Sequence, residues 1–507
     1  MLFILIIMKS KMFLLLVFGF QLSYAQFSNR IWCFGDSAGV DFTIPNSPTL
    51  FTSGMDCRGS CCSIADSAGL LFYAHTLNLY TSTTFLHGAV RNKLHQIMDN
   101  GDSLVGEGWY NEMVIVPDPS NFNQFWLFHI GVLLPYAGIF NSLVDITSNG
   151  GLGAVMSKNN QLQSFETFVG ITAIKHGNGR DWWVLCKRSG NGNPNNQFCQ
   201  YLVTPQGLQG PYFYNIGLLS GSDFGHFTFN HKGNKLALAN ASGLLELYNF
   251  DRCTGIISNP VTLQYPTPGN PPLFSGIEFS PNDSVMYVTT TTQTFYLYQY
   301  NMAAVNIAAS KTTIATISTP EWSGGYLKLA PDGKIYWSIA WYDGVNFNYP
   351  YDSSAYNMYN MNLSVINNPN ALGAACNFTP FSFYLGGKRT YYGLPNNPDY
   401  NLGPLVGSGC DTITHLTPSP SPQERGVLTA FYHSGWEKVF LNAEGVKGNT
   451  YRLQVVDAMG KIVYSSAGKT QPPYFTKDVG CAGWSSGIYV VVLQTEKEKL
   501  DVKFVKL

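Results

Sequence analysis

A motif of about 50 residues recurs through most of this chain and constrains its fold more than any other feature. Its clearest copies are Ile277–Val288 and Leu327–Trp337, in which a short alternating strand runs into a polar turn and a second strand. The spacings between successive turns are 50 to 59 residues. The turn residues are Ala65, Pro117, His176, His231, Pro281 and Pro331. A period of this length holds four short strands.

Four-stranded units at a regular period predict an all-β fold, a β-propeller in which each unit is one blade. A seventh copy, Tyr391–Asn397, supplies an inner strand without partners. The strands Arg30–Gly35 and Gly39–Thr43 have the opposite deficit, because no inner strand precedes them. Joining the two ends would complete the last blade and remove an exposed sheet edge. We therefore expect seven blades, with six and eight as the alternatives.

Composition agrees with a turn-rich β protein and excludes some partners. Charged residues make up 12% of the chain and aromatic residues 14%, and there are 50 Gly and 27 Pro. Such a chain is poor in strong helix formers. The net charge of −1 gives no electrostatic basis for binding nucleic acid. No cofactor is expected, because the sequence has no phosphate-binding loop, calcium loop or zinc ligand pattern.

The last seventy or so residues form a different kind of unit. Tyr451, Leu453 and Val455 alternate with polar residues, and Ile488, Val490 and Val492 repeat the period of two. A turn at Asp457–Lys461 and a charged hairpin at Glu496–Lys499 separate the strands. Gly460 can adopt a positive φ in the first of these turns. This pattern predicts a small C-terminal β-sandwich.

These residues resemble the C-terminal sorting domain of the type IX secretion system of Bacteroidetes. The resemblance implies export across the outer membrane, with the type IX machinery as a partner. It departs from the usual pattern at its start, where Leu416–Pro422 stands in place of a Tyr-Pro-Asn-Pro-like segment. An ordinary accessory β-sandwich is the alternative. The resemblance implies these sorting-signal residues: Asp457, Gly460, Gly487, Tyr489, Lys503 and Lys506.

The opposite end has the pattern of a secretory signal peptide, residues 1–25. Lys9 and Lys11 precede an apolar run, and Ser23–Ala25 supplies small residues for cleavage. The run is shorter than the roughly 20 residues that span a bilayer. The Sec translocon is therefore the first expected partner, and the mature chain is expected to have no transmembrane segment. Together the two ends predict a protein that is secreted or held at the outer-membrane surface.

The segments Trp32–Phe42 and Cys62–Tyr73 are similar to the openings of propeller-like ectodomains in secreted Bacteroidetes proteins. That family implies architecture and location more than chemistry. The expected domains are a signal peptide at 1–25, a β-propeller-like domain at 26–402, a Pro/Ser/Gly linker at 403–428 and a sorting domain at 429–507.

The cysteines suit an oxidising compartment. Cys186 and Cys199 flank a Gly/Asn-rich loop and are the first candidates for a disulfide. Cys57 with Cys61 or Cys62 is the second, since sequence alone does not fix the connectivity.

Candidates for chemistry are few. No nucleophile elbow or zinc-protease motif occurs. Glu112, Glu278, Lys328 and Arg389 fall on or beside inner strands, where blades meet at the axis. A pair of carboxylates among them would suit a glycosidase. The preferred interpretation is that they hydrogen-bond within a polar axial channel, and no catalytic residue is assigned.

Aromatic residues are the stronger functional signal. A long insertion begins at Trp341, and its Tyr, Asn and Trp side chains suit stacking on sugar rings or a protein partner. Trp182, Trp183 and Trp337 lie at strand positions, where packing between blades is the default. The candidate ligand-binding residues are Trp341, Tyr342, Tyr349, Tyr351 and Tyr356.

The sequence therefore predicts an exported propeller that binds an extracellular glycan or protein and is not an enzyme. The competing classes are a carbohydrate-active hydrolase or lyase with a propeller fold, and a structural surface component.

Overall fold

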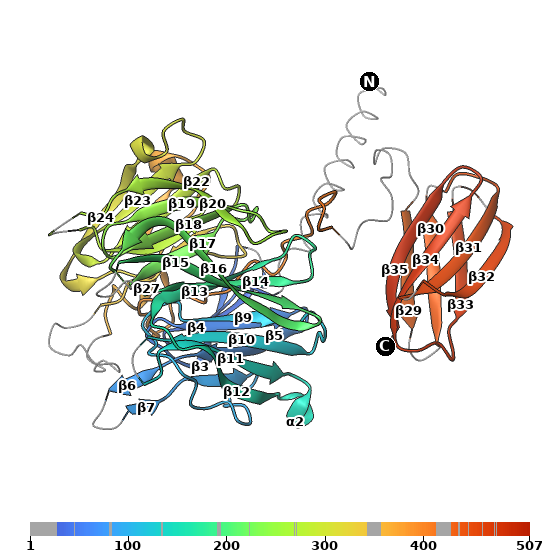
Figure 1. Cartoon of the computed structure of the whole chain (residues 1–507), viewed down its shortest axis with the longest axis horizontal. Helices are drawn as coiled ribbons and strands as arrows, with labels where there is room; N and C mark the ends of the chain where they lie inside the picture. The colour runs from blue at the N-terminus through green and yellow to red at the C-terminus, as the bar shows by residue number, and fades with distance from the viewer. Residues whose placement is uncertain are drawn as a thin grey trace, which may run out of the picture. The chain divides into compact units, whose positions relative to one another are not determined.

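The computed structural model describes residues 28–506, except residues 45, 81–83, 133–134, 190–193, 223, 268, 270, 342–355, 412–426, 434–436, 445, 459, 471 and 473. The chain divides into two compact units, residues 1–415 and 416–507. Figure 1 colours the sheets of the first unit from blue to orange and those of the second in red.

Five four-stranded antiparallel sheets follow one another along the first unit, each built from consecutive strands. They are the third to seventh sheets of a ring, and their strands come in chain order from the axis outward. The third is β9 (Met113–Pro117), β10 (Gln124–Gly131), β11 (Gly138–Asp145) and β12 (Ala154–Gln163). The fourth is β13 (Thr167–Lys175), β14 (Trp182–Arg188), β15 (Asn195–Thr204) and β16 (Gly207–Ser220). The fifth is β17 (Gly225–Phe229), β18 (Lys235–Asn240), β19 (Leu245–Phe250) and β20 (Ile257–Gln264). The sixth is β21 (Phe274–Phe279), β22 (Val285–Thr290), β23 (Thr292–Asn301) and β24 (Thr312–Ser323). The seventh is β25 (Leu327–Leu329), β26 (Ile335–Trp337), β27 (Asn362–Ile366) and β28 (Phe378–Tyr384).

Two sheets before these contain three strands each. The first consists of β1 (Ile31–Phe34), β2 (Asp36–Asp41) and β3 (Thr49–Asp56). The second consists of β4 (Cys61–Asp66), β5 (Gly69–His75) and β8 (Ala89–Asn92), with a separate hairpin of β6 (Asn78–Tyr80) and β7 (Thr84–Leu86) between them. The short elements α2 (Ser148–Gly151), η1 (Ala308–Ser310) and η3 (Gly373–Cys376) lie in connections. Neighbouring inner strands lie side by side in the order β4, β9, β13, β17, β21, β25.

Residues 389–398 occupy the seventh inner position, between β25 and β4. The Tyr326 N–H, just before β25, donates to the Tyr392 carbonyl at 2.9 Å, and the Asn396 N–H donates to the Cys61 carbonyl of β4 at 2.8 Å. On the outer side, Asp36 forms an antiparallel bridge with Arg389, and the Asn29 amide donates to the Pro398 carbonyl. The C-terminal segment of the ring thus lies inside β1, β2 and β3 and completes their blade.

The ring is a seven-bladed β-propeller that closes by joining its two ends, as the sequence predicts. The closing blade is irregular, because residues 389–398 share one bridge with the N-terminal strands rather than a full ladder. Apolar packing compensates at this seam. Trp32 is fully buried, with its ring centroid 4.8 Å from Phe42 and 5.9 Å from Tyr336 of β26. These aromatic contacts join the first sheet to the last.

The second unit is a two-sheet β-sandwich, the fold expected for the tail. One sheet has the order β29 (Val427–His433), β30 (Lys438–Glu444), β33 (Tyr474–Gly480). The other has the order β32 (Ile462–Lys469), β31 (Thr450–Asp457), β34 (Gly487–Thr495), β35 (Lys499–Lys506). One hydrophobic core joins both sheets. Gly460 has φ of 82°, as its turn requires.

One strand of the tail presents the opposite face from the one that the sequence pattern suggests. In β34 the buried side chains are Tyr489, Val491 and Leu493, while Ile488 is exposed and Val490 is half-buried. Both alternating sets of this strand are apolar, so period-two patterning cannot decide which set faces the core.

Candidate functional site

An aromatic pocket lies on the face of the ring where the inner strands begin. Its volume is about 250 Å³. The wall residues come from the starts of β17 and β21, from turns after β18 and β22, from the loop before β9 and from the closing segment. They are Trp109, Tyr110, Phe224, Gly225, Ala241, Leu273, Phe274, Ser275, Thr291 and Tyr392. Apart from the phenol groups of Tyr110 and Tyr392, none of these side chains is ionisable.

The aromatic walls hold one another in place. The Tyr110 ring centroid lies 5.9 Å from Phe224, 5.7 Å from Tyr392 and 5.6 Å from Tyr326, in tilted or edge contacts. Tyr110 is half-buried, and Phe224 is 44% exposed. The cluster therefore presents apolar ring surface to solvent from a fixed frame, which suits a flat, partly apolar ligand.

Glu112 positions this pocket. Its carboxylate accepts hydrogen bonds from the Gly108 N–H at 2.6 Å, the Trp109 N–H at 2.8 Å and the Thr76 hydroxyl at 2.9 Å. These bonds tighten the loop that presents Trp109, and the Arg58 guanidinium stacks on the Trp109 ring at 3.9 Å. Burial, and secondarily the nearby Glu107, raises the pKa of Glu112 to about 8. Glu112 thus supports the loop and lies outside the pocket lining.

A second, smaller cavity of about 80 Å³ lies along the axis and is polar. Glu278 and Lys328, two of the catalytic candidates, line it. The Glu278 carboxylate accepts the Phe279 N–H at 2.9 Å and the Leu329 N–H at 3.0 Å, while the Lys328 ammonium donates to the Asn397 carbonyl at 2.7 Å. Both groups are used to join inner strands and the closing segment, as the preferred interpretation of the sequence has it.

His226 also lines the axial cavity and is neutral. It is buried, its Nδ1 accepts the Ile277 N–H at 3.1 Å, and its ring packs 4.8 Å from Tyr326. Burial, with a smaller contribution from Lys328, lowers its pKa to about 3. It therefore acts as a fixed acceptor between β17 and β21, with no proton to exchange near neutral pH.

Arg389, the last of the candidate residues, lies in the segment that closes the ring. Its guanidinium pairs with Asp36 at 3.3 Å and lies 4.2 Å from the Tyr356 ring centroid. The Tyr356 hydroxyl also donates to Asp36. Burial, followed by this hydrogen bond, raises the pKa of Tyr356 to about 12. Tyr356 thus contacts Asp36 and Arg389 within the protein.

Of the predicted ligand-binding residues, Tyr342, Tyr349 and Tyr351 lie outside the described residues. Trp341 is half-buried. The residue before it, Ala340, pairs with Gly324, and the backbone at Gly324 lies against Thr291 of the aromatic pocket. Trp341, where the insertion begins, therefore follows a backbone pair that lies beside the pocket. Its role in binding stays a prediction.

The three tryptophans expected at strand positions are core residues. Trp182 and Trp183 are buried in β14, and Trp337 is buried in β26. Trp337 packs against Phe295 of the preceding blade, with ring centroids 5.5 Å apart.

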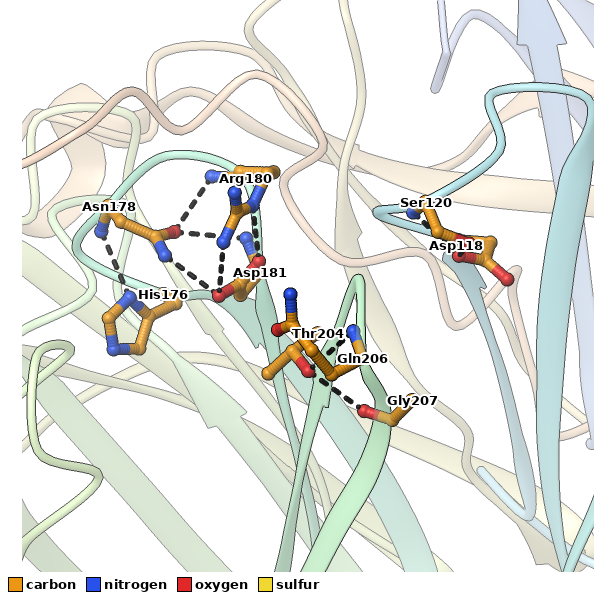
Figure 2. A network of polar contacts seen from close by, with 9 residues as sticks. All are labelled: Asp118, Ser120, His176, Asn178, Arg180, Asp181, Thr204, Gln206 and Gly207. Carbon is orange, nitrogen blue, oxygen red and sulfur yellow. Dashed lines mark hydrogen bonds and ion pairs between the residues drawn. The ribbon is translucent and has the colours of Figure 1, made fainter. Parts of the chain in front are cut away.

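The Gly/Asn-rich sequence of the His176 turn predicts a solvent-exposed turn, and the structure shows that this prediction is wrong, because His176 and Asn178 are buried. Figure 2 shows the turn network, in which Asn178 bridges His176 and Asp181. The Asn178 N–H donates to His176 Nδ1 at 3.0 Å, and the other ring nitrogen lies 2.8 Å from the Cys253 carbonyl. His176 is 8% exposed because a neighbouring turn and the chain after the ring cover it.

The cysteines pair differently from the first expectation. Cys186 and Cys199 stand opposite each other on β14 and β15, but both are free thiols in the structure. Cys57, Cys61 and Cys62 are free as well. The disulfide among the described residues joins Cys253 to Cys410, 157 positions away. Because the two cysteines are so far apart in sequence, no local sequence pattern indicates that they pair. The described residues contain no cluster of metal-ligating side chains.

The aromatic pocket itself was missed by the sequence analysis. A signal was present in Gly106–Tyr110, where two aromatic residues follow closely spaced glycines just before an inner strand. The other walls come from the fifth blade, the sixth blade and the closing segment, and only the ring geometry brings them together.

Comparison with known proteins identifies the tail. Residues 437–507 match the family model described as a secretion system C-terminal sorting domain. The protein is therefore exported and is secreted or displayed at the outer-membrane surface. Among the described residues, no helix has the length and apolar character needed to cross a membrane. The roles of the individual sorting-signal residues stay predictions.

Solved structures similar to the chain include several with low sequence identity. The β-propeller domain of Cps50 (Swd1) from Myceliophteria thermophila is 10% identical over 62% of this chain and 93% of its own, with a TM-score of 0.36. An auxiliary nutrient binding protein from Bacteroides thetaiotaomicron is 10% identical over 61% and 72%, with a TM-score of 0.32. An exo-β-1,3-galactanase from Phanerochaete chrysosporium is 10% identical over 81% and 92%, with a TM-score of 0.33. No curated protein matches in sequence. Ring topology and the sorting tail together define an exported β-propeller protein.

Proposed function

We propose that this exported propeller binds a neutral extracellular glycan in the aromatic pocket and does not transform it. The observation that carries the proposal is the set of five aromatic rings facing one pocket, whose described lining residues include no carboxylate or cation. Pyranose rings have apolar faces that stack on aromatic side chains. Among the described lining residues, a formally charged peptide or nucleotide ligand would find no charged partner.

The competing function is a carbohydrate-active enzyme. Glycosidases need two carboxyl groups flanking the scissile bond. Glu278 accepts two backbone N–H groups, and Glu112 is committed to its loop. This favours binding over hydrolysis. A secretory signal peptide at residues 1–25, a Bacteroidetes source and the Sec and type IX machinery as export partners belong to the same proposal.

The test is a glycan-array screen of the full mature chain, followed by incubation of each bound polysaccharide with the protein. We expect selective binding of neutral glycans and no released product. Product release would contradict the non-catalytic assignment. The glycan assignment would be contradicted if no glycan bound and the pocket bound a protein ligand instead.

A further inference from the structure

The chain does not leave the ring directly after its closing segment. Residues 398–411, here called the strap, cross the end of the channel where the inner strands finish. The Tyr400 hydroxyl donates to the Ile115 carbonyl of β9 at 3.0 Å, and the Lys175 ammonium of β13 donates to the Tyr400 carbonyl. The Tyr400 ring packs 5.7 Å from Trp182. The strap thus runs from the closing blade across to the fourth blade.

Arg252 holds the next part of the strap. This buried side chain follows β19 and donates to the Lys175 carbonyl at 2.8 Å, the His176 carbonyl at 3.2 Å and the Gly403 carbonyl at 2.6 Å. One guanidinium therefore joins the fourth blade, the fifth blade and the strap. The Leu405 N–H adds a bond to the Gly177 carbonyl at 2.8 Å.

The strap ends in the disulfide between Cys253 and Cys410, whose Cα atoms lie 5.4 Å apart. The bond sits directly on the His176 turn. A Cβ at Gly177 would lie 2.5 Å from Cys410 Sγ and 2.8 Å from Cys253 Sγ, so the turn must have glycine there. Asp411, 1% exposed, accepts the Gly407 N–H and completes the fold of the strap.

The position of this bond along the chain gives it a mechanical role. Residues after Asp411 lead to the sorting domain, so any pull on the tail reaches the strap first. Immediately upstream is the closing segment, which is held by scattered hydrogen bonds to several elements rather than by a ladder. With Cys410 bonded to Cys253, tension passes instead into the β19–β20 turn of the fifth blade.

We propose that the strap is a lock: the Cys253–Cys410 disulfide forms once residues 389–398 have closed the ring, and it prevents the sorting tail from peeling that segment out. The lock requires closure first, because Cys410 reaches Cys253 only after the chain has crossed the channel. This role is independent of the glycan proposal.

Formation of the lock is a two-electron oxidation. The two S–H bonds break, one S–S bond forms, two protons leave, and two electrons reduce the disulfide of an exported thiol–disulfide oxidoreductase or of oxidised glutathione to thiols. In an oxidising compartment the lock then persists.

The experiment is force spectroscopy on the full mature chain, pulled through handles at its N-terminus and in the linker after residue 411, without ligand. Three samples are compared: oxidised protein, the same protein folded and then reduced, and the double variant Cys253→Ser with Cys410→Ser. The matched control is Cys376→Ser, a free buried thiol in the seventh blade.

In the reduced protein and the double variant, the first step should come at low force and release residues 389–411, about 80 Å of chain at roughly 3.5 Å per residue. Oxidised protein and the Cys376→Ser control should lack this step. Identical first steps in oxidised and reduced protein would overturn the proposal. Since reduction follows folding, failure of the double variant to fold would leave the comparison of oxidised and reduced protein intact.

Hydrogen exchange supplies a second readout without force. On reduction, the amides of Tyr392 and Leu405 should exchange at least about tenfold faster, since constraint of the strap is lost. Unchanged exchange at both amides would also overturn the proposal.

Discussion

Replacing Gly393 by alanine tests the way the ring closes. Gly393 lies in the closing segment, where it crosses the backbone of Gly59 just before β4. A Cβ at Gly393 would lie 1.8 Å from the Gly59 carbonyl oxygen and 2.5 Å from its carbon. Contacts this short are with backbone atoms, which cannot rotate aside as a side chain would. The closing segment and the chain before β4 must therefore separate.

Overpacking of a core by one or more methylenes costs about 1–3 kcal/mol where side chains can adjust. Because the new Cβ meets backbone atoms, we expect Gly393→Ala to lower the free energy of unfolding by about 3 kcal/mol or more. At roughly 2.1 cal/mol/K per residue, the 384 residues from 28 to 411 unfold with an entropy near 0.8 kcal/mol/K. The expected loss in Tm is then about 4 °C.

The chain offers a matched control in Gly403→Ala. Gly403 lies ten residues further on, in the strap, and a Cβ there meets nothing within 4 Å. We expect this variant to melt within about 1 °C of the parent or slightly above it, since alanine restricts the unfolded chain.

The assay is thermal unfolding of both variants, read by near-ultraviolet circular dichroism, with hydrogen exchange of residues 31–41. Faster exchange in those strands should accompany Gly393→Ala, because they lose their inner partner. Equal stability of the two variants would refute the closure described above.

Three further predictions concern charge and export. Glu112 has a folded pKa of about 8, above its unfolded value, so its contribution to stability should fall as pH rises from about 5 to 8. In a series of Tm measurements over this pH range, Glu112→Gln should lose less stability than the parent. An equal pH dependence of Tm in the two proteins would contradict this prediction. His226 has a folded pKa of about 3, below its unfolded value, so the protein should lose stability as pH falls below about 6.5. His226→Asn should lose less stability than the parent, measured by urea unfolding between pH 6.5 and 4.5. Deletion of residues 429–507 should leave the protein in the periplasm, measured by cell fractionation, whereas normal export would refute the sorting assignment.

The periodic part of the fold was predictable from sequence because each blade repeats one local pattern. The turn residues from Ala65 to Pro331 all fall where an inner strand ends. The closure was predictable too, because the strands at Arg30–Thr43 and the copy at Tyr391 each lacked what the other supplied. Both inferences depend on local alternation and on sheet edges needing partners.

The site was far less predictable, because it depends on contacts between distant segments. Tyr110, Phe224 and Tyr392 meet only when three parts of the ring come together, and neither Phe224 nor Tyr392 lies in a distinctive motif. His176 is buried by the strap and by the turn at Cys253, which no local composition reveals. The aromatic insertion after Trp341 drew attention by its composition, whereas the described pocket is built from isolated aromatic residues.

The affinity of the full mature chain for its best array glycan, compared with that of Phe224→Ala, tests the central claim most directly. Phe224 is 44% exposed at the pocket, and Tyr265, 66% exposed and outside the pocket lining, supplies the control Tyr265→Ala. Loss of one stacking wall should weaken binding by tenfold or more, about 1.4 kcal/mol or above, with unchanged Tm. The control should bind like the parent, and none of the proteins should release product. Equal affinity of Phe224→Ala and the parent would contradict the assignment of this pocket as the glycan site.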